Sequence, residues 1–255
     1  MDSIIFNNET FTFEVCANSV ESCIAAQQAG AQRVELCAAI PEGGTTPSLG
    51  EIVVARQQLR DTRLHVIIRP RGGDFLYSDI ELERMIIDIE TCRKEGVDGV
   101  VFGCLTDEGE IDLEKNKILM EYAKGMSVTF HRAFDRCLSP LKALEQLASL
   151  GFDRILTSGQ QPTAIEGVTL LAHLHQAAQG KIHIMAGCGV NEHNIRSIYE
   201  STGIHEFHFS ARERIASRMR YQNPDVKMGN ADVDETTILQ TTPSMVRRVM
   251  AALHQ

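Results

Sequence analysis

Acidic, basic and thiol side chains stand at the ends of several short apolar segments of this sequence. Glu14 and Cys16 share one segment, and Glu35 and Cys37 share the next. Because residues two apart on a strand point to the same side, each carboxylate should lie beside a thiol. A third segment ends in Arg69. An unpaired carboxylate in an apolar strand is costly, so these residues indicate either a structural ion-pair network or a reactive site.

Proton transfer is the chemistry that the two carboxylates suggest. Glu14 and Glu35 suit a general acid and base, because mutual repulsion and the charge of Arg69 would tune their pKa values. His131 ends a later segment, and histidine exchanges protons near neutral pH. We therefore predict Glu14, Glu35, Arg69 and His131 as catalytic residues that converge in one solvent-reachable cluster.

Two thiols at equivalent ends of neighbouring strands would suit a soft metal ion. Sulfur ligands favour Cu(I), whereas zinc usually takes four ligands. Cys16 and Cys37 are therefore predicted metal ligands, with Cu(I) as the candidate cofactor. The competing interpretation is that both are small apolar side chains filling a core layer. The other five cysteines form no evident ligand set.

Glycine-rich turns and basic side chains suggest a site for an anion. The turn at Gly187 and Gly189 is expected to lead into a helix N-terminus at Asn191, where backbone amides favour negative charge. Arginines and serines at other segment ends add hydrogen-bond donors. The further candidates for binding a small anionic or phosphorylated ligand are Arg71, Arg132, Ser158, Ser210 and Arg212.

The apolar segments recur at a regular interval. The predicted strands are residues 11–17, 33–38, 64–70, 99–105, 127–133, 154–159, 182–187 and 206–211. Their starts are spaced by about 28 residues on average, which is the length of one βα unit. This pattern predicts the α/β class and a single domain over residues 1–255, a (β/α)8 TIM-type barrel whose strand ends surround one pocket.

Capping signals mark the predicted helices. Ser48 and Ser78 each precede a glutamate by three residues, which is the pattern of a capping box. Asn18 and Asn191 are predicted N-caps. Residues 212–241 break the rhythm, so we expect a long loop after strand eight, followed by a C-terminal helix. Such a loop is a surface excursion, a lid over the pocket or a subunit contact.

Composition excludes several classes of protein. The chain has 34 acidic and 25 basic residues, a formal net charge of −9, whereas nucleic-acid-binding proteins are usually basic. It has no apolar run of the roughly 18 residues needed to span a membrane and no secretory signal. Its seven cysteines form no C-x-x-C pair and suggest no disulfide framework. We expect a cytoplasmic protein with reduced thiols.

Six motifs in order closely resemble those of the CutC family. They lie within about residues 11–230 and are Glu14–Cys16, Arg33–Cys37, Glu42–Ser48, Ile68–Phe75, Thr129–Asp135 and Ile155–Gly159. The resemblance implies a cytoplasmic barrel that acts in copper homeostasis and binds Cu(I) through Cys16 and Cys37. It also implies self-association into homodimers or larger homo-oligomers, and it implies no organic cofactor.

Two functions therefore stay open. One is copper handling, which the resemblance favours. The other is a metal-independent lyase or isomerase acting on a small anionic or phosphorylated substrate at the C-terminal barrel mouth. The residues favour this enzyme, because a copper buffer needs neither Arg69 nor His131. No lysine stands at a predicted strand end, which argues against an aldolase that forms a Schiff base.

Overall fold

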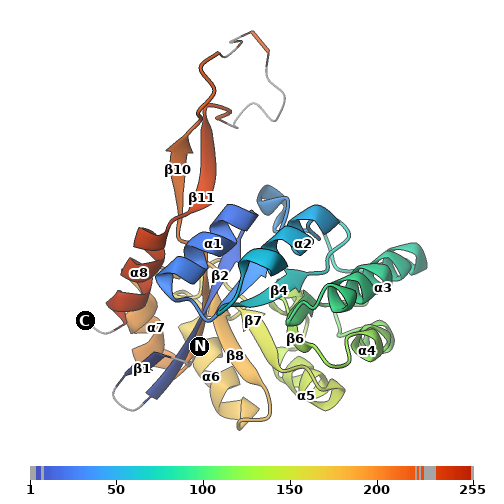
Figure 1. Ribbon diagram of the computed structural model, residues 1–255. Helices are drawn as coiled ribbons and strands as arrows, with labels where there is room; N and C mark the ends of the chain where they lie inside the picture. The colour runs from blue at the N-terminus through green and yellow to red at the C-terminus, as the bar shows by residue number, and fades with distance from the viewer. Residues whose placement is uncertain (1–3, 7–8, 222, 224, 227–233, 254–255) are drawn as a thin grey trace.

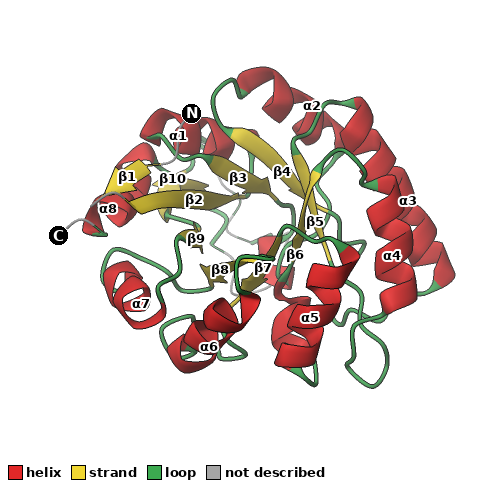
Figure 2. Cartoon of the chain, turned by 90° about the horizontal axis from the view of Figure 1, so that it is seen from below, coloured by secondary structure: helices red, strands yellow, loops and turns green. Residues whose placement is uncertain are grey.

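Eight parallel strands form a closed barrel, which confirms the predicted fold class. The computed structural model describes residues 4–6, 9–221, 223, 225–226 and 234–253. Each strand pairs with the next, and the last pairs with the first to close the ring (Figure 2). The strands are β2 (Glu9–Ala17), β3 (Arg33–Leu36), β4 (Arg63–Ile67), β5 (Gly99–Phe102), β6 (Ser127–Phe130), β7 (Arg154–Thr157), β8 (His183–Gly187) and β9 (Glu206–Phe209). A short strand, β1 (Ile4–Phe6), lies antiparallel to β2.

Helices surround this ring of strands (Figure 1 and Figure 2). They are α1 (Val20–Ala29), α2 (Leu49–Gln58), α3 (Asp79–Lys94), α4 (Leu113–Tyr122), α5 (Pro140–Leu150), α6 (Val168–Ala178), α7 (Ile195–Thr202) and the C-terminal α8 (Pro243–Ala252). Two 3-10 helices, η1 (Ile40–Glu42) and η2 (Arg132–Arg136), follow β3 and β6. Within the part of the chain that the structure describes, every helix is too short or too polar to cross a membrane.

The predicted helix starts are partly right. Ser48 and Ser78 both make complete capping boxes. The N-cap of α1 is Ser19, not Asn18, because the Asn18 side chain instead accepts a hydrogen bond from Ser22 Oγ and donates one to a backbone carbonyl of a later strand. Asn191 is also not an N-cap. Its side chain accepts from the backbone N–H two residues on and closes a turn, and α7 begins four residues later.

The two faces of the barrel sheet differ in polarity. The outer face packs against the helices and carries the hydrophobic core, including the fully buried Phe11, Phe13, Phe102, Phe130 and Phe207. The inner face carries many polar side chains into the barrel lumen, together with apolar ones such as Met185, which contacts Arg33. Strand register places these side chains level with one another on neighbouring strands. The ionisable lumen residues of β2, β3, β4, β7 and β9 are Glu14, Arg33, Glu35, His65, Arg154, Glu206 and His208.

One glycine makes room for a lumen side chain. Gly99 on β5 pairs in register with His65 on β4. A Cβ atom added at Gly99 would lie 2.4 Å from His65 Nε2, closer than non-bonded atoms approach. The imidazole of His65 therefore occupies the space that any other residue at position 99 would fill.

The segment predicted as a long loop begins and ends in strands. Strands β10 (Arg212–Ala216) and β11 (Thr237–Thr241) pair antiparallel and form an arm that extends away from the barrel (Figure 1). Two hydrogen bonds fix the base of this arm to the α1 end of the barrel. Asn18 Nδ2 donates to the Leu239 carbonyl at 2.7 Å, and the Thr241 N–H donates to Ser22 Oγ at 3.1 Å.

We predict that Gly99→Ala destabilises the protein by about 1–3 kcal/mol, because the new methyl group overpacks the lumen against His65. Urea denaturation measures this free energy of unfolding. Gly50→Ala is the matched control, since a Cβ on α2 at position 50 meets nothing closer than Ser48 Oγ at 3.9 Å. An unchanged unfolding midpoint for Gly99→Ala would contradict the packing described here.

Candidate functional site

A pocket of about 360 Å³ opens at the carboxyl ends of the barrel strands. This is the end at which TIM-barrel proteins place their ligands. Apolar walls surround a few polar groups, as is usual in small-molecule sites. The predicted site residues that line it are Cys16, Glu35, Cys37, Arg69, His131, Arg132, Gly189, Ser210 and Arg212. The predicted site residues that do not line this pocket are Glu14, Arg71, Ser158 and Gly187.

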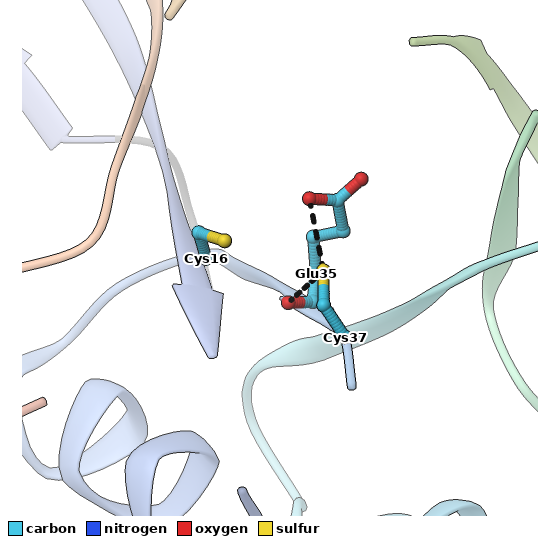
Figure 3. Close-up of side chains that lie close together, drawn as sticks. All are labelled: Cys16, Glu35 and Cys37. Atoms are coloured by element: carbon cyan, nitrogen blue, oxygen red, sulfur yellow. Dashed lines mark hydrogen bonds between the residues drawn. The ribbon is translucent and has the colours of Figure 1, made fainter. Parts of the chain in front are cut away.

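The two predicted thiol ligands meet on one side of this pocket. Ligand atoms of Cys16, Glu35 and Cys37 all lie within 4.8 Å of one another (Figure 3). Cys37 Sγ donates a hydrogen bond to Glu35 Oε2 at 3.3 Å. Arg212 donates to Cys16 Sγ, also at 3.3 Å. Cys16 is partly exposed and Cys37 is buried, so Cys16 is the more accessible residue of the two.

The two thiols differ in acidity. Interaction with Cys37 lowers the pKa of Cys16 well below its ordinary value, and His208 and Arg212 assist while burial opposes. The same interaction raises the pKa of Cys37 well above its ordinary value, and burial adds to it. The thiolate is the form that binds metals and attacks electrophiles. The pair therefore presents a thiolate at Cys16 and a thiol at Cys37.

Glu35 is a protonated acid near neutral pH. Burial raises its pKa to about 8, and the positive charge of His208 only partly offsets this. His208 Nε2 lies 3.7 Å from Glu35 Oε2, while Oε1 has no hydrogen-bond partner among the described residues. Such a carboxylic acid can donate a proton at a pH where ordinary carboxyl groups are ionised.

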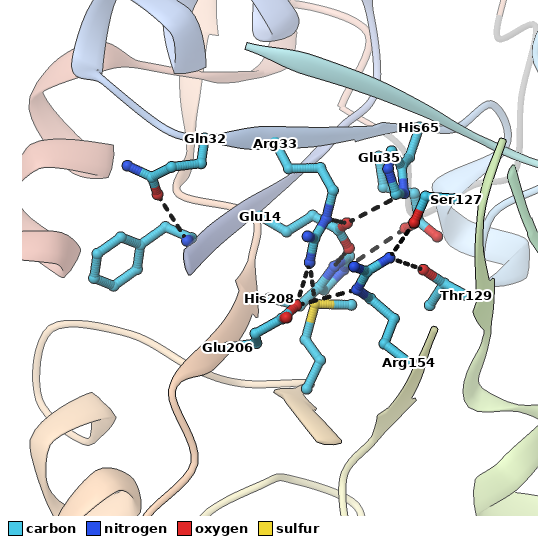
Figure 4. A network of polar contacts seen from close by, with 12 residues as sticks. Glu14, Gln32, Arg33, Glu35, His65, Ser127, Thr129, Arg154, Glu206 and His208 are labelled. Carbon is cyan, nitrogen blue, oxygen red and sulfur yellow. Dashed lines mark hydrogen bonds and ion pairs between the residues drawn. The ribbon is translucent and has the colours of Figure 1, made fainter. Parts of the chain in front are cut away.

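Glu14 lies beneath the pocket and is ionised. Burial alone would raise its pKa, but the Arg33 charge and a hydrogen bond with His208 lower it well below its usual range. Arg33 Nε donates to one Glu14 oxygen, and His208 Nδ1 contacts the other at 2.7 Å (Figure 4). Arg33 also contacts Glu206 at 2.7 Å. The expected cluster of four groups reachable by solvent is therefore divided, because Glu14 is fully buried and, unlike the other three, does not line the pocket.

His208 is the residue that the sequence reasoning missed. Burial alone would lower its pKa, but hydrogen bonds to Cys16 and Glu14 raise it well above the ordinary value. As a buried imidazolium it links Glu14 to Glu35. A signal was available, because period-two alternation places His208 on the same face as the selected Ser210.

Arg69 has a different partner from the one expected. Its guanidinium donates to the backbone carbonyls of Glu42, Gly44 and Gly73, not to a carboxylate. It thus holds the η1 loop against the pocket. His131 lies nearby, and burial together with the charge of Arg69 lowers its pKa to about 3. His131 Nδ1 accepts from the Ala133 N–H at 3.3 Å, and Nε2 has no partner among the described residues.

The predicted anion-binding residues separate into three groups. Arg71 lies outside the pocket, paired with Glu81 and Asp74. Arg132 contacts Asp135 at 2.7 Å and donates to Ser158 Oγ at 2.9 Å, so part of its charge is already matched.

The third group stays together at the pocket wall. Gly189, Ser210 and Arg212 all line the pocket, whereas Gly187 packs against Leu156. The expected helix dipole does not reach this turn, because α7 begins only at Ile195. An anion here would rely on Arg212 and backbone donors.

The fold and the pocket define a class of protein: a TIM barrel with a Cys–Glu–Cys cluster, compatible with metal binding, at its carboxyl mouth. The CutC family model matches residues 11–213, and the chain belongs to the CutC family. A CutC family protein of Bacteroides thetaiotaomicron is 61% identical over 95% of this chain and 98% of its own length. The Homo sapiens copper homeostasis protein cutC homolog is 46% identical over 94% of this chain and 88% of its own.

Solved structures agree with this assignment. The crystal structure of CutC from Streptococcus agalactiae superposes with a TM-score of 0.76 at 36% identity, covering 79% of this chain and 99% of that one. Phosphoribosyl anthranilate isomerase from Thermotoga maritima has a TM-score of 0.58 at 11% identity, with 96% of this chain and 99% of that one covered. At that identity the likeness shows the fold alone.

We predict that His131 makes stability depend on pH. Its folded pKa is about 3, and the unfolded value is about 6.5. Between these values the unfolded chain binds a proton that the folded chain does not. The free energy of unfolding should therefore fall as pH falls, by about 1.4 kcal/mol per pH unit from this group. In His131→Asn, which retains an acceptor for the Ala133 N–H, this contribution should vanish. Urea denaturation of both proteins between pH 6 and 4 measures the two slopes, and equal slopes would contradict the prediction.

Proposed function

We propose that this protein handles Cu(I) as cargo in the cytoplasm, with Cys16 and Cys37 as ligands. The observation that carries the proposal is the approach of the two sulfurs within 4.8 Å. Metal–thiolate bonds are about 2.3 Å long in zinc sites, so one ion between these sulfurs can contact both. Two soft ligands match Cu(I) better than they match zinc.

The surroundings of the sulfurs support transfer of an ion. Cys16 is already held as a thiolate and is the more exposed thiol, so it suits first contact with the metal. Cys37 must lose a proton before it binds, and because Glu35 is already protonated near neutral pH, this proton is released to solvent as the metal replaces it. None of the seven cysteines is in a disulfide, which fits a reducing compartment.

Self-association is part of the same proposal. The arm and the residues that directly follow β10 carry apolar side chains in solvent. Met219, Tyr221 and Ile238 are each more than half exposed. Exposed apolar groups of this kind mark surfaces that bind other proteins. We propose that the family's implied homo-oligomer uses such surfaces.

We predict that Cys16→Ser and Cys37→Ser each lower Cu(I) affinity by at least about tenfold, because serine offers no soft ligand. Anaerobic competition against a chromophoric Cu(I) chelator measures affinity and stoichiometry. Cys188→Ser is the control, since Cys188 lines the same pocket outside the Cys16–Glu35–Cys37 cluster. Unchanged stoichiometry in the double variant of Cys16 and Cys37 would overturn the proposal.

A second function is supported by the pKa of Glu35, which is about 8. We propose, as the alternative, a metal-independent lyase or isomerase in which Glu35 exchanges a proton with a small anionic substrate. Arg212, Ser210 and Gly189 line the pocket and would bind the anion. His131 is neutral at physiological pH, and because its Nδ1 accepts from the Ala133 N–H, its Nε2–H can donate a hydrogen bond there.

We predict that Glu35→Gln changes the free energy of unfolding by less than about 1 kcal/mol, because glutamine resembles the protonated acid already present. Glu14→Gln should instead cost about 3–5 kcal/mol, since it removes the charge that Arg33 and His208 share. Chemical denaturation of both variants distinguishes them. A similar loss in both would show that Glu35 is structural and would remove the enzyme proposal.

A further inference from the structure

A second cavity, of about 660 Å³, opens at the opposite end of the barrel. Its lining comes from the amino ends of the strands and the turns before them, so it is the basal mouth of the lumen. Most of the lining side chains are polar or charged. They include Arg33, Arg56, Arg60, Arg63, Arg154 and Glu206.

The charge of this cavity is opposite to that of the whole chain. Five arginines line it against three carboxylates, whereas the chain carries a formal net charge of −9. Three of the arginines are already paired. Arg33 and Arg154 both contact Glu206, at 2.7 and 3.1 Å, and Arg56 pairs with Asp98.

Two arginines are left over. Among the residues that the structure describes, the guanidinium groups of Arg60 and Arg63 have no ion pair or hydrogen bond, and both residues are exposed. Arg63 begins β4 directly opposite Arg33 in the strand register, so it stands at the lumen mouth. Of the lining carboxylates, Asp61 is the one that lacks an arginine partner. One carboxylate cannot neutralise two guanidinium groups, so the cavity keeps excess positive charge.

We propose that the basal cavity binds a small phosphate-bearing anion through Arg60 and Arg63. Guanidinium groups contact phosphate oxygens in a bidentate manner, and a concave surface of one charge sign concentrates ions of the other. Arg33 and Arg154 on the floor of the cavity are already paired with Glu206, so an anion held by Arg60 and Arg63 displaces no existing ion pair. His183, two-thirds exposed at the rim, adds a further donor. This site is independent of the copper proposal. It shares no lining residue with the pocket at the carboxyl ends of the strands, which we call the carboxyl pocket.

Inorganic pyrophosphate is the probe. Its binding is measured by isothermal titration calorimetry at constant ionic strength set with chloride. The parent protein is Arg212→Gln, which removes the leading anion donor of the carboxyl pocket. The test variant adds Arg60→Gln and Arg63→Gln, and the matched control adds Arg196→Gln, an exposed arginine on α7 that pairs only with Glu200 among the described residues.

The parent and the control should bind pyrophosphate equally, and the test variant should bind it at least about tenfold more weakly, since two charge-assisted contacts are lost. The unliganded melting temperature of the test variant should match that of the parent, because neither side chain has an ion pair or hydrogen bond to lose among the described residues. Equal binding by all three proteins would overturn the proposal, and so would the absence of binding by the parent.

Discussion

The buried carboxylate of Glu14 is the constraint on which the lumen depends. A charge at that depth requires compensation, and Arg33 and His208 supply it from the two neighbouring strands. Since His208 becomes an imidazolium in meeting this need, its other nitrogen faces Glu35. The imidazolium of His208 thus helps to lower the pKa of Cys16 and partly offsets the burial that raises the pKa of Glu35. The contacts of Glu14 with Arg33 and His208 join three neighbouring strands, and buried polar contacts of this kind can specify a single arrangement of strands.

This constraint explains why the hydrophobic core lies outside the barrel. The inner face holds ionisable side chains, so the large apolar residues gather between the sheet and the helices. The lumen then adds little hydrophobic stabilisation, and the helices must contribute most of it. In return, polar side chains extend through the lumen from the basal cavity, which Arg33 lines, to the carboxyl pocket, which Cys16 lines. Charges in the lumen interact more strongly than they would in water, because the effective dielectric constant there is lower.

The sequence predicted the barrel well because its signals are local and repeated. All eight predicted strands overlap strands of the structure, and the approach of Cys16 to Cys37 was expected because the two thiols stand at equivalent ends of neighbouring parallel strands. The failures concern partners distant in the chain. Arg69 was expected to meet a carboxylate, yet three backbone carbonyls surround it, and such carbonyls leave no mark in a sequence. His208 was missed for the related reason that only barrel closure brings β9 beside β2.

The arm has a consequence for how members of this family can diverge. Its first residue, Arg212, contacts Cys16 Sγ, and its base is anchored to α1 by Asn18 and Ser22. The family model stops at residue 213, one residue beyond that contact. The root of the arm thus belongs to the pocket and to the segment that the family model matches, whereas most of β10 and all of β11 lie beyond that segment. A change in the outer part of the arm need not remove the guanidinium from the pocket.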